Sequence, residues 1–311
     1  MEVIPGTRLD ANESAFFARS LEVIKAKSYD IQYPEFKARR LIPVSGDAGP
    51  GAASITYQQF DQVGMAKIIA SYAGGLPRAD VIGKEFTTPI RSIGCSYGYS
   101  LQDVRAAAMA NVPLQQRKAN AARRANDSLV NIIAWFGLSV VGLRGLLTHP
   151  NIRTGSVPNG AGGTPQWSTK TPQEILADIT SILTGIPSLT YGIEEPDTLL
   201  LPINQYALLT TMPYSAQQPT MLMNIVKEAH PGVTIERVAE LSGAYASLHG
   251  LSNVDRMVAY KRSPDKLTLE IPQDFEQLPV QEHGLEYEVP CHSRIGGVIV
   301  YYPLSIAVKD S

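Results

Sequence analysis

The first part of the chain carries apolar residues at helical spacing. Phe16, Phe17, Leu21 and Ile24 would share one side of an amphipathic helix, and a turn-rich Tyr-Pro pair follows it. An apolar stripe needs a partner, which is either the core of the same chain or a neighbouring molecule. The sequence favours the first, and it predicts an arm over residues 1–40.

The pattern between residues 41 and 89 changes to short strand-like pieces separated by turns. The strand-like pieces are 54–57 and 84–87, and the glycine-rich stretches 46–51 and 74–77 predict turns. Few bulky residues in this segment could form a core face. A two-stranded excursion of this kind would be marginal alone, so we expect it to pack against another molecule.

Strict alternation over residues 91–99 predicts a strand with aromatic and apolar residues on one face and Ser or Gly on the other. Ser100, with Asp103 three residues later, has the pattern of a helix cap. Apolar residues then continue at helical spacing as far as Phe136. Because proline cannot donate its backbone amide, Pro113 predicts a break in this helical region.

The remainder of the chain mixes both kinds of element. Residues 155–163 form a Gly-rich loop, and Thr171-Pro172 predicts the start of a helix that continues to residue 183. The leucine-rich stretch 197–202 predicts a buried strand, and 297–302 predicts a last, strongly apolar strand. The fold class is therefore α+β, without internal repeats.

Composition limits the function classes. The 311 residues are 44% hydrophobic and 18% charged, which is typical of an ordered protein but poor in charge for one whose whole surface faces water. We therefore expect additional contact surface. The formal net charge of -2 argues against a dedicated nucleic-acid binder, which normally has a basic excess.

Targeting segments and metal sites are not apparent in the sequence. The N-terminus lacks the pattern of a signal peptide, and the most apolar stretch, 129–143, is too short to span a bilayer. Cys95 and Cys291 are far apart and have no further ligand at zinc spacing, so we expect two reduced thiols, with no disulfide framework and no cofactor. The acidic residues at 194, 195 and 197 are interpreted as solvated surface.

One motif has an enzymatic interpretation. Residues 94–98 match the G-x-S-x-G nucleophile elbow, in which Ser96 would be the nucleophile of a serine hydrolase. In an elbow the helix begins directly after the serine, whereas here alternation continues through Tyr99. No histidine stands in a setting that identifies it as the general base. The hydrolase remains a distant alternative, and we expect a protein that is not an enzyme.

Three stretches carry a resemblance to a known family. Residues 101–114 read Leu-Gln-Asp-Val-Arg-Ala-Ala-Ala-Met-Ala-Asn-Val-Pro-Leu, and they are followed by the helical region 117–137 and by Gly-Leu-Leu-Thr-His-Pro-Asn-Ile at 145–152. Together with the order of the elements, they resemble the major capsid proteins of tailed bacteriophages. That family has the Hong Kong 97-type fold, which it shares with encapsulin shells, and the resemblance covers essentially the whole chain.

The resemblance implies a domain organisation. Its expected parts are an N-terminal arm at 1–40, an extended two-stranded E-loop at 41–89, a P-domain with a long spine helix at 90–154, an A-domain at 155–282, and a C-terminal strand at 283–311 that returns to the P-domain. The E-loop would reach over a neighbouring subunit.

The resemblance also implies a function. Many copies would self-assemble as hexamers and pentamers into an icosahedral shell around double-stranded DNA, with only weak contact to the DNA and none to a membrane. The protein would be made in the host cytoplasm and reside in the virion capsid. Scaffold, portal and decoration proteins are possible partners and would be separate chains. Lys67 and Lys84 lie in the expected E-loop, but neither matches a cross-linking motif, so we expect non-covalent closure. A close alternative is an encapsulin-type compartment filled with enzyme.

Inter-subunit contacts are expected in three places. The arm and the E-loop would contribute aromatic and apolar side chains, and the spine helix would contribute basic ones that either face solvent or form a patch toward a subunit or nucleic acid. The candidates are Phe16, Phe17, Leu21, Tyr57, Phe60, Arg117, Lys118, Arg123 and Arg124.

Overall fold

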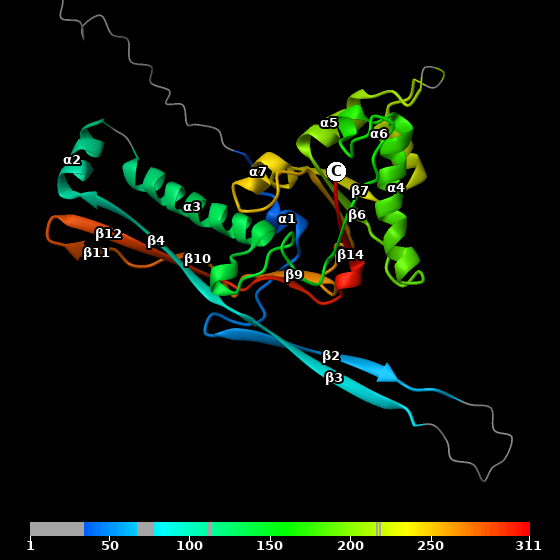
Figure 1. The fold of residues 1–311 in the computed structure, drawn as a ribbon. Helices are drawn as coiled ribbons and strands as arrows, with labels where there is room; N and C mark the ends of the chain where they lie inside the picture. The colour runs from blue at the N-terminus through cyan, green and yellow to red at the C-terminus, as the bar shows by residue number, and fades with distance from the viewer. Residues whose placement is uncertain (1–33, 67–77, 111–112, 216, 218) are drawn as a thin grey trace, which may run out of the picture. The chain divides into compact units, whose positions relative to one another are not determined.

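The structure is a computed structural model that describes residues 34–66, 78–110, 113–215, 217 and 219–311 (Figure 1). The chain divides into Met1–Glu35 and a second unit, Phe36–Ser311, whose fold follows. Phe16, Phe17 and Leu21, and with them most of the predicted arm, lie outside the described residues.

Among the described residues, the largest sheet has five strands, and β6, Thr198–Pro202, which lies inside this sheet, is buried throughout. Leu199 and Leu201 of this strand pack into one apolar cluster together with α4, Pro172–Leu189, while Leu200 packs into a second cluster together with α3, Leu114–Phe136. The predicted buried leucine strand is therefore confirmed. In spatial order the strands are β5 (Arg153–Ser156), β14 (Ile306–Asp310), β8 (Arg256–Tyr260), β6 (Thr198–Pro202) and β7 (Thr234–Val238).

Helix α4 starts where the sequence predicts it to start. The Thr171 hydroxyl accepts a hydrogen bond from the Glu174 amide, and the Glu174 carboxylate accepts one from the Thr171 amide at 2.8 Å, which is a complete capping box. The helix continues past the predicted end at residue 183 because Ile186 is still buried against the sheet. On the same side as α4 lie α5 (Ile203–Thr211), α6 (Leu222–Ala229), η3 (Trp167–Thr169) and η5 (Pro303–Ser305), whereas α7 (Gly243–Ser247) and η4 (Ala239–Leu241) pack into the cluster that contains α3.

A second sheet is built around one long strand pair. β4, Arg91–Ser100, is antiparallel to β12, Glu286–Ile295, in a register that is unbroken over ten residue pairs. Helix α3 packs against this pair, and the Ser293 hydroxyl donates a hydrogen bond to Asn126 Oδ1 at 2.5 Å. The outer strands β10 (Gln273–Gln277) and β11 (Gln281–His283) also pair with β12.

The helical region after β4 is broken at the predicted proline. Helix α2, Leu101–Ala110, is capped by the reciprocal hydrogen bonds predicted from the sequence: the Asp103 amide donates to the Ser100 hydroxyl at 3.1 Å, and the Ser100 amide donates to the Asp103 carboxylate at 3.0 Å. Helix α3 begins at Leu114, directly after Pro113. Both predictions are confirmed.

The Gly-Leu-Leu-Thr segment at 145–148 closes the C-terminal end of α3. The amides of Leu146 and Leu147 donate to the carbonyls of Ala134 and Trp135 at 2.8 and 2.9 Å, and the Thr148 hydroxyl donates to the next carbonyl at 2.8 Å. These carbonyls have no partner within the helix. A Cβ at Gly145 would meet the backbone of residues 135–137, so only glycine fits this approach. Between helix and segment lies the turn η2 (Ser139–Val141).

The end of the chain differs from the single C-terminal strand predicted for 283–311. β12 pairs with β4, β13 (Gly297–Val300) pairs with β9 (Leu267–Glu270), and β14 joins the five-stranded sheet. The Gly296-Gly297 turn separates β12 from β13, and Gly297 has a φ of 77° next to the backbone of Arg144. β9 and β13 belong to a third sheet. Its remaining strand is β1 (Val44–Ser45), which pairs with β9 and follows the short helix α1 (Ala38–Leu41).

The predicted two-stranded excursion is a long hairpin. β2, Ser54–Val63, is antiparallel to β3, Asp80–Pro89, and the two form a sheet of their own among the described residues (Figure 1). β3 is followed almost directly by β4, so the hairpin is joined to the long strand pair.

Candidate interaction surfaces

The β2–β3 hairpin exposes apolar side chains on both faces. Residues whose positions are opposite in register project to the same face. Phe60 and Val81 therefore lie on one face and are 64% and 58% exposed, while Val63 and Ile82 lie on the other and are 48% and 61% exposed. No further strand pairs with the hairpin among the described residues. The hairpin is therefore poorly covered by its own chain.

Tyr57 attaches the base of the hairpin to the rest of the chain. Its ring stacks on Phe86 at a centroid distance of 5.2 Å and meets Tyr301 edge-on at 5.0 Å. Its hydroxyl donates to the Val300 carbonyl at 3.3 Å. Burial, and next to it the neighbouring Tyr301, raises the pKa of Tyr57. Of the two E-loop candidates, Tyr57 thus has intramolecular partners, while the ring of Phe60 lies over Gly83 and stays exposed.

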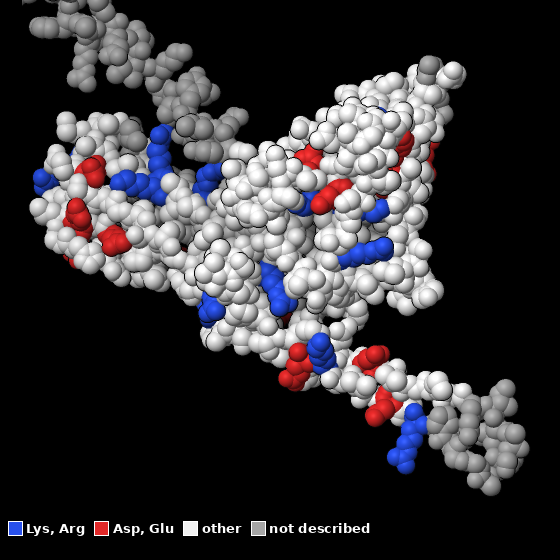
Figure 2. Space-filling view, viewed as in Figure 1, with Lys and Arg blue, Asp and Glu red and all other residues white. Residues whose placement is uncertain are grey.

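The four basic candidates on α3 do not form one uniform face. Lys118 donates to the Gly98 carbonyl at 2.6 Å, and the Arg124 guanidinium lies 5.0 Å from the centre of the Phe36 ring. Arg117 and Arg123 are exposed. Basic and acidic side chains alternate with large uncharged areas on the face shown in Figure 2. The structure therefore places part of the predicted patch in contacts within the chain.

Helix α2 has little cover. It contains no buried residue, and Met109 is 91% exposed. A cleft of about 430 Å³ lies between this helix and the start of α3, and its lining includes Tyr99, Val104, Ala107 and Leu114. An apolar cleft and an uncovered helix on one side of the molecule indicate a surface that is available to a partner.

The structure does not build a nucleophile elbow at Ser96. Ser96 lies in the middle of β4, opposite Pro290 of β12, where the backbone is extended. The strand continues to Ser100, so the sharp strand-to-helix turn of an elbow does not occur at this serine. Ser96 and His283 line one depression of the surface, and His283 Nε2 lies 3.8 Å from a carboxylate oxygen of Glu288. The described residues also contain no cluster of His, Cys, Asp and Glu that could hold a metal ion.

The interpretation of residue 194 as solvated surface is wrong. Glu194 is 5% exposed, and its carboxylate accepts a hydrogen bond from Lys266 at 2.5 Å. The Lys266 ammonium also lies 4.2 Å from the centre of the Tyr302 ring. Because Lys266 is distant in sequence, no local pattern could have indicated this pairing.

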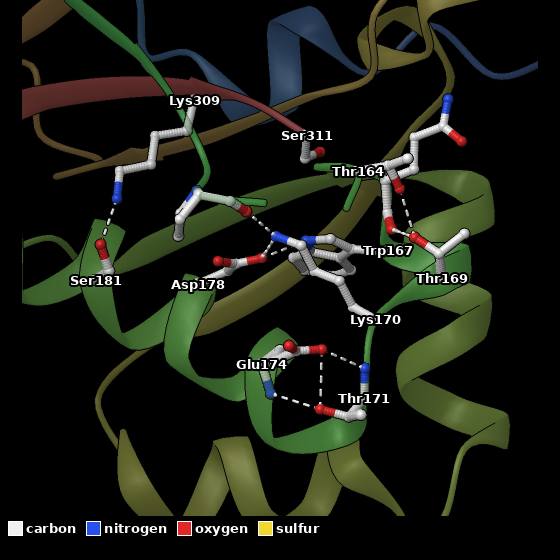
Figure 3. A network of polar contacts seen from close by, with 12 residues as sticks. Thr164, Trp167, Thr169, Lys170, Thr171, Glu174, Asp178, Ser181, Lys309 and Ser311 are labelled. Atoms are coloured by element: carbon white, nitrogen blue, oxygen red, sulfur yellow. Dashed lines mark hydrogen bonds and ion pairs between the residues drawn. The ribbon is translucent and has the colours of Figure 1, made fainter. Parts of the chain in front are cut away.

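A buried polar network was also missed. Lys170 and Asp178 form an ion pair at 2.6 Å with side-chain exposures of 1% and 3% (Figure 3). The same carboxylate oxygen accepts from Trp167 Nε1 at 3.1 Å, and Lys170 also donates to the Pro158 carbonyl at 2.7 Å. This network fixes the loop before α4 onto the helix. Its burial and its remoteness from the hairpin indicate a structural role.

Comparisons with known proteins agree with one another. The family model described as major capsid protein matches residues 64–311. The capsid protein of Myoviridae phage XM1 is similar in structure, with a TM-score of 0.82 and 15% identity over 96% of this chain and 99% of that one. Mycobacterium phage Ogopogo gives a TM-score of 0.63 and 11% identity over 96% and 99% of the two chains.

A third structure is similar at a lower score. The virus-like particle from Pyrococcus furiosus gives a TM-score of 0.50 and 17% identity over 87% of this chain and 90% of that one. No curated protein matches the sequence. None of the described helices has the length and apolar character needed to cross a membrane.

Proposed function

Because this chain belongs to the major capsid protein family, we propose that many copies of it assemble, as hexamers and pentamers, into a closed icosahedral shell around double-stranded DNA. The fold is the one shared by tailed-phage capsid proteins, as predicted from the sequence. The family places the protein in the virion capsid. Synthesis in the host cytoplasm is part of the proposal.

The observation that carries the proposal is the hairpin that exposes apolar side chains on both faces. An isolated two-stranded hairpin is marginal in water, and long exposed strand edges promote unwanted pairing. Side chains such as Phe60 and Ile82 would become buried if the hairpin lay on a neighbouring subunit. Closed symmetry repeats such a contact around the particle, so modest interfaces add up to a stable shell.

The domain limits inferred from the resemblance remain a prediction. The hairpin would be the E-loop within 41–89, and the β4–β12 pair and α3 would belong to the P-domain. Strands β6, β7 and β8 would belong to the A-domain, whereas β14 of the same sheet lies within 283–311 and β5 crosses the predicted boundary at residue 155. We propose that the E-loop covers a neighbour and that the arm at 1–40 contributes a second contact. Arg117 and Arg123 are further contact candidates.

Charge supports weak attachment of the packaged DNA. Each phosphate contact adds salt-dependent affinity, and a net charge of -2 provides no basic excess for tight binding. We propose that the inner surface holds the DNA loosely. Separate scaffold, portal and decoration proteins are expected partners of such a shell.

Electron microscopy and light scattering of the purified protein test the assembly. We expect closed particles from the wild type and only small species from Phe60→Asp, because a carboxylate would be placed in the apolar contact. Gln59→Asp is the matched control, since it adds the same charge at an exposed position of the same strand, opposite Lys84 and on the other face from Phe60. Equal assembly of both variants would refute the role of the hairpin, and a wild type that stays small under all conditions would refute the shell.

The particle contents distinguish the two kinds of shell. Nuclease-protected DNA is expected for a virion, whereas a co-purifying enzyme would support the encapsulin-type alternative. The match to the major capsid protein family favours the first.

A further inference from the structure

The two cysteines of the chain lie opposite each other in the long strand pair. Cys95 of β4 and Cys291 of β12 are partners in the register, within an unbroken antiparallel ladder. Directly opposite residues in such a ladder have Cα atoms about 4.5 to 5.5 Å apart. Disulfides span about 4.4 to 6.8 Å between Cα atoms, so the backbone already has the required separation.

The two thiols also project to the same side. Cys95 Sγ lies 3.7 Å from the Ala122 carbonyl of α3, so this side is the one that the helix covers. Cys291 is 3% exposed, whereas Cys95 is half-buried. Burial first, and then the adjacent Cys95 thiol, raises the pKa of Cys291, which is consistent with two thiols in contact.

We propose that Cys95 and Cys291 are a disulfide site, at which a cross-strand bond closes when the protein meets an oxidising environment. Both thiols belong to one chain, so the bond could close in a single subunit whether or not a shell forms. Its position gives it a mechanical consequence, because β4 leads directly from the hairpin strand β3 and into helix α2. A covalent bond to β12 would prevent β4 from separating from the sheet.

The reaction is an exchange with an external disulfide such as oxidised glutathione. The more accessible Cys95 attacks as a thiolate, forms a mixed disulfide and releases one glutathione thiolate. The Cys291 thiolate then attacks Cys95 Sγ and releases the second. The two protein thiols lose two electrons and two protons, and both glutathiones take them up. Because the pKa of Cys291 is raised, the second step becomes faster as the pH rises.

Mass spectrometry of the purified full-length protein tests the site. The protein is incubated with oxidised glutathione at pH 8, quenched with acid, unfolded and treated with a thiol-alkylating reagent. We expect a product two hydrogen atoms lighter, without alkyl groups, in which the peptides that contain Cys95 and Cys291 are joined. Dithiothreitol should restore two alkylation sites.

Variants and stability complete the test. After the same oxidation, Cys95→Ser should retain Cys291 as one alkylation site, whereas Cys291→Ser should stop at the mixed disulfide, with one glutathione on Cys95 and no alkylation site. If either variant fails to fold, the wild-type mass alone decides. In the wild type, the oxidised form should melt higher than the reduced form by on the order of 5 °C. Two free thiols after oxidation of the wild type, a persistent glutathione adduct on it, disulfide-linked dimers or an unchanged melting temperature would each overturn the proposal.

Discussion

The buried ion pair between Lys170 and Asp178 provides a quantitative test of the structure. Replacing Asp178 with Ala removes the acceptor of two hydrogen bonds, one from Lys170 Nζ at 2.6 Å and one from Trp167 Nε1 at 3.1 Å (Figure 3). The Lys170 ammonium then keeps the Pro158 carbonyl, at 2.7 Å, as its protein partner, and its side chain is 1% exposed. A charge in this position is almost completely cut off from water.

The burial of the ion pair determines how much each substitution lowers the free energy of unfolding. Removing one partner of a buried ion pair lowers the free energy of unfolding by about 3–5 kcal/mol, since the remaining charge is neither solvated nor paired. We expect this loss for Asp178→Ala and a comparable one for Lys170→Met. The double variant Lys170→Met/Asp178→Ala buries no charge, and only Trp167 Nε1 and the Pro158 carbonyl lose a partner. Its loss should be about 1–3 kcal/mol, so the coupling between the two positions should exceed about 2 kcal/mol.

Urea denaturation, followed by tryptophan fluorescence, measures the free energy of unfolding of the wild type, the two single variants and the double variant. The exposed pair between Arg40 and Glu236, with an N–O distance of 3.0 Å and side chains 49% and 26% exposed, is the control. Glu236→Gln should lower the free energy of unfolding by less than about 1 kcal/mol, because water screens the pair. Additive effects at 170 and 178, or single variants that lose no more than the control, would refute the buried network.

Three further perturbations have defined outcomes. Burial, and then Arg144, lowers the pKa of His149 from 6.5 to about 4. As the pH drops from 6.5 to 4 the unfolded chain therefore takes up this proton before the folded one does, and the free energy of unfolding falls by up to about 3 kcal/mol. Melting curves of His149→Gln should lose that part of the acid sensitivity while matching the wild type at pH 8. Gly145→Ala should lower the free energy of unfolding by at least about 3 kcal/mol, because its Cβ would lie 2.6 Å from the Phe136 carbonyl carbon. Gly155→Ala is the control, since its Cβ would meet nothing within 4 Å. Equal melting temperatures for the two variants would contradict the close approach. Ser100→Ala should lower it by about 1 kcal/mol through loss of the α2 cap, and urea midpoints that do not move would show that the cap is dispensable.

Large parts of the fold could be predicted because the responsible interactions are local. The cap at Ser100, the break at Pro113 and the start of α4 at Thr171 depend on residues within one helical turn, so their patterns are written in adjacent positions. The alternation of β4 was visible because a strand has a fixed period of two. The class followed from such elements, whereas the family was inferred from a resemblance carried mainly by residues 101–114 and 145–152, and the family model confirms the family.

The candidate surfaces were only partly accessible from the sequence. The poor core of the hairpin was predicted, and the structure shows Phe60 exposed, but Tyr57 has an intramolecular partner, Tyr301, that no local pattern indicates. Side chains such as Lys118 can reach backbone carbonyls of other elements, which a helical pattern cannot reveal.

The sequence by itself determined where several helices and strands of this protein begin, and its low content of charged residues led to the expectation of additional contact surface. Only the tertiary structure decided which distant residues meet. Glu194 is buried because Lys266 reaches it, and Cys95 and Cys291 oppose each other because β12 returns along β4. Local preferences act over a few residues, whereas strand register is set by the burial of whole faces, and only that register brings the two thiols together.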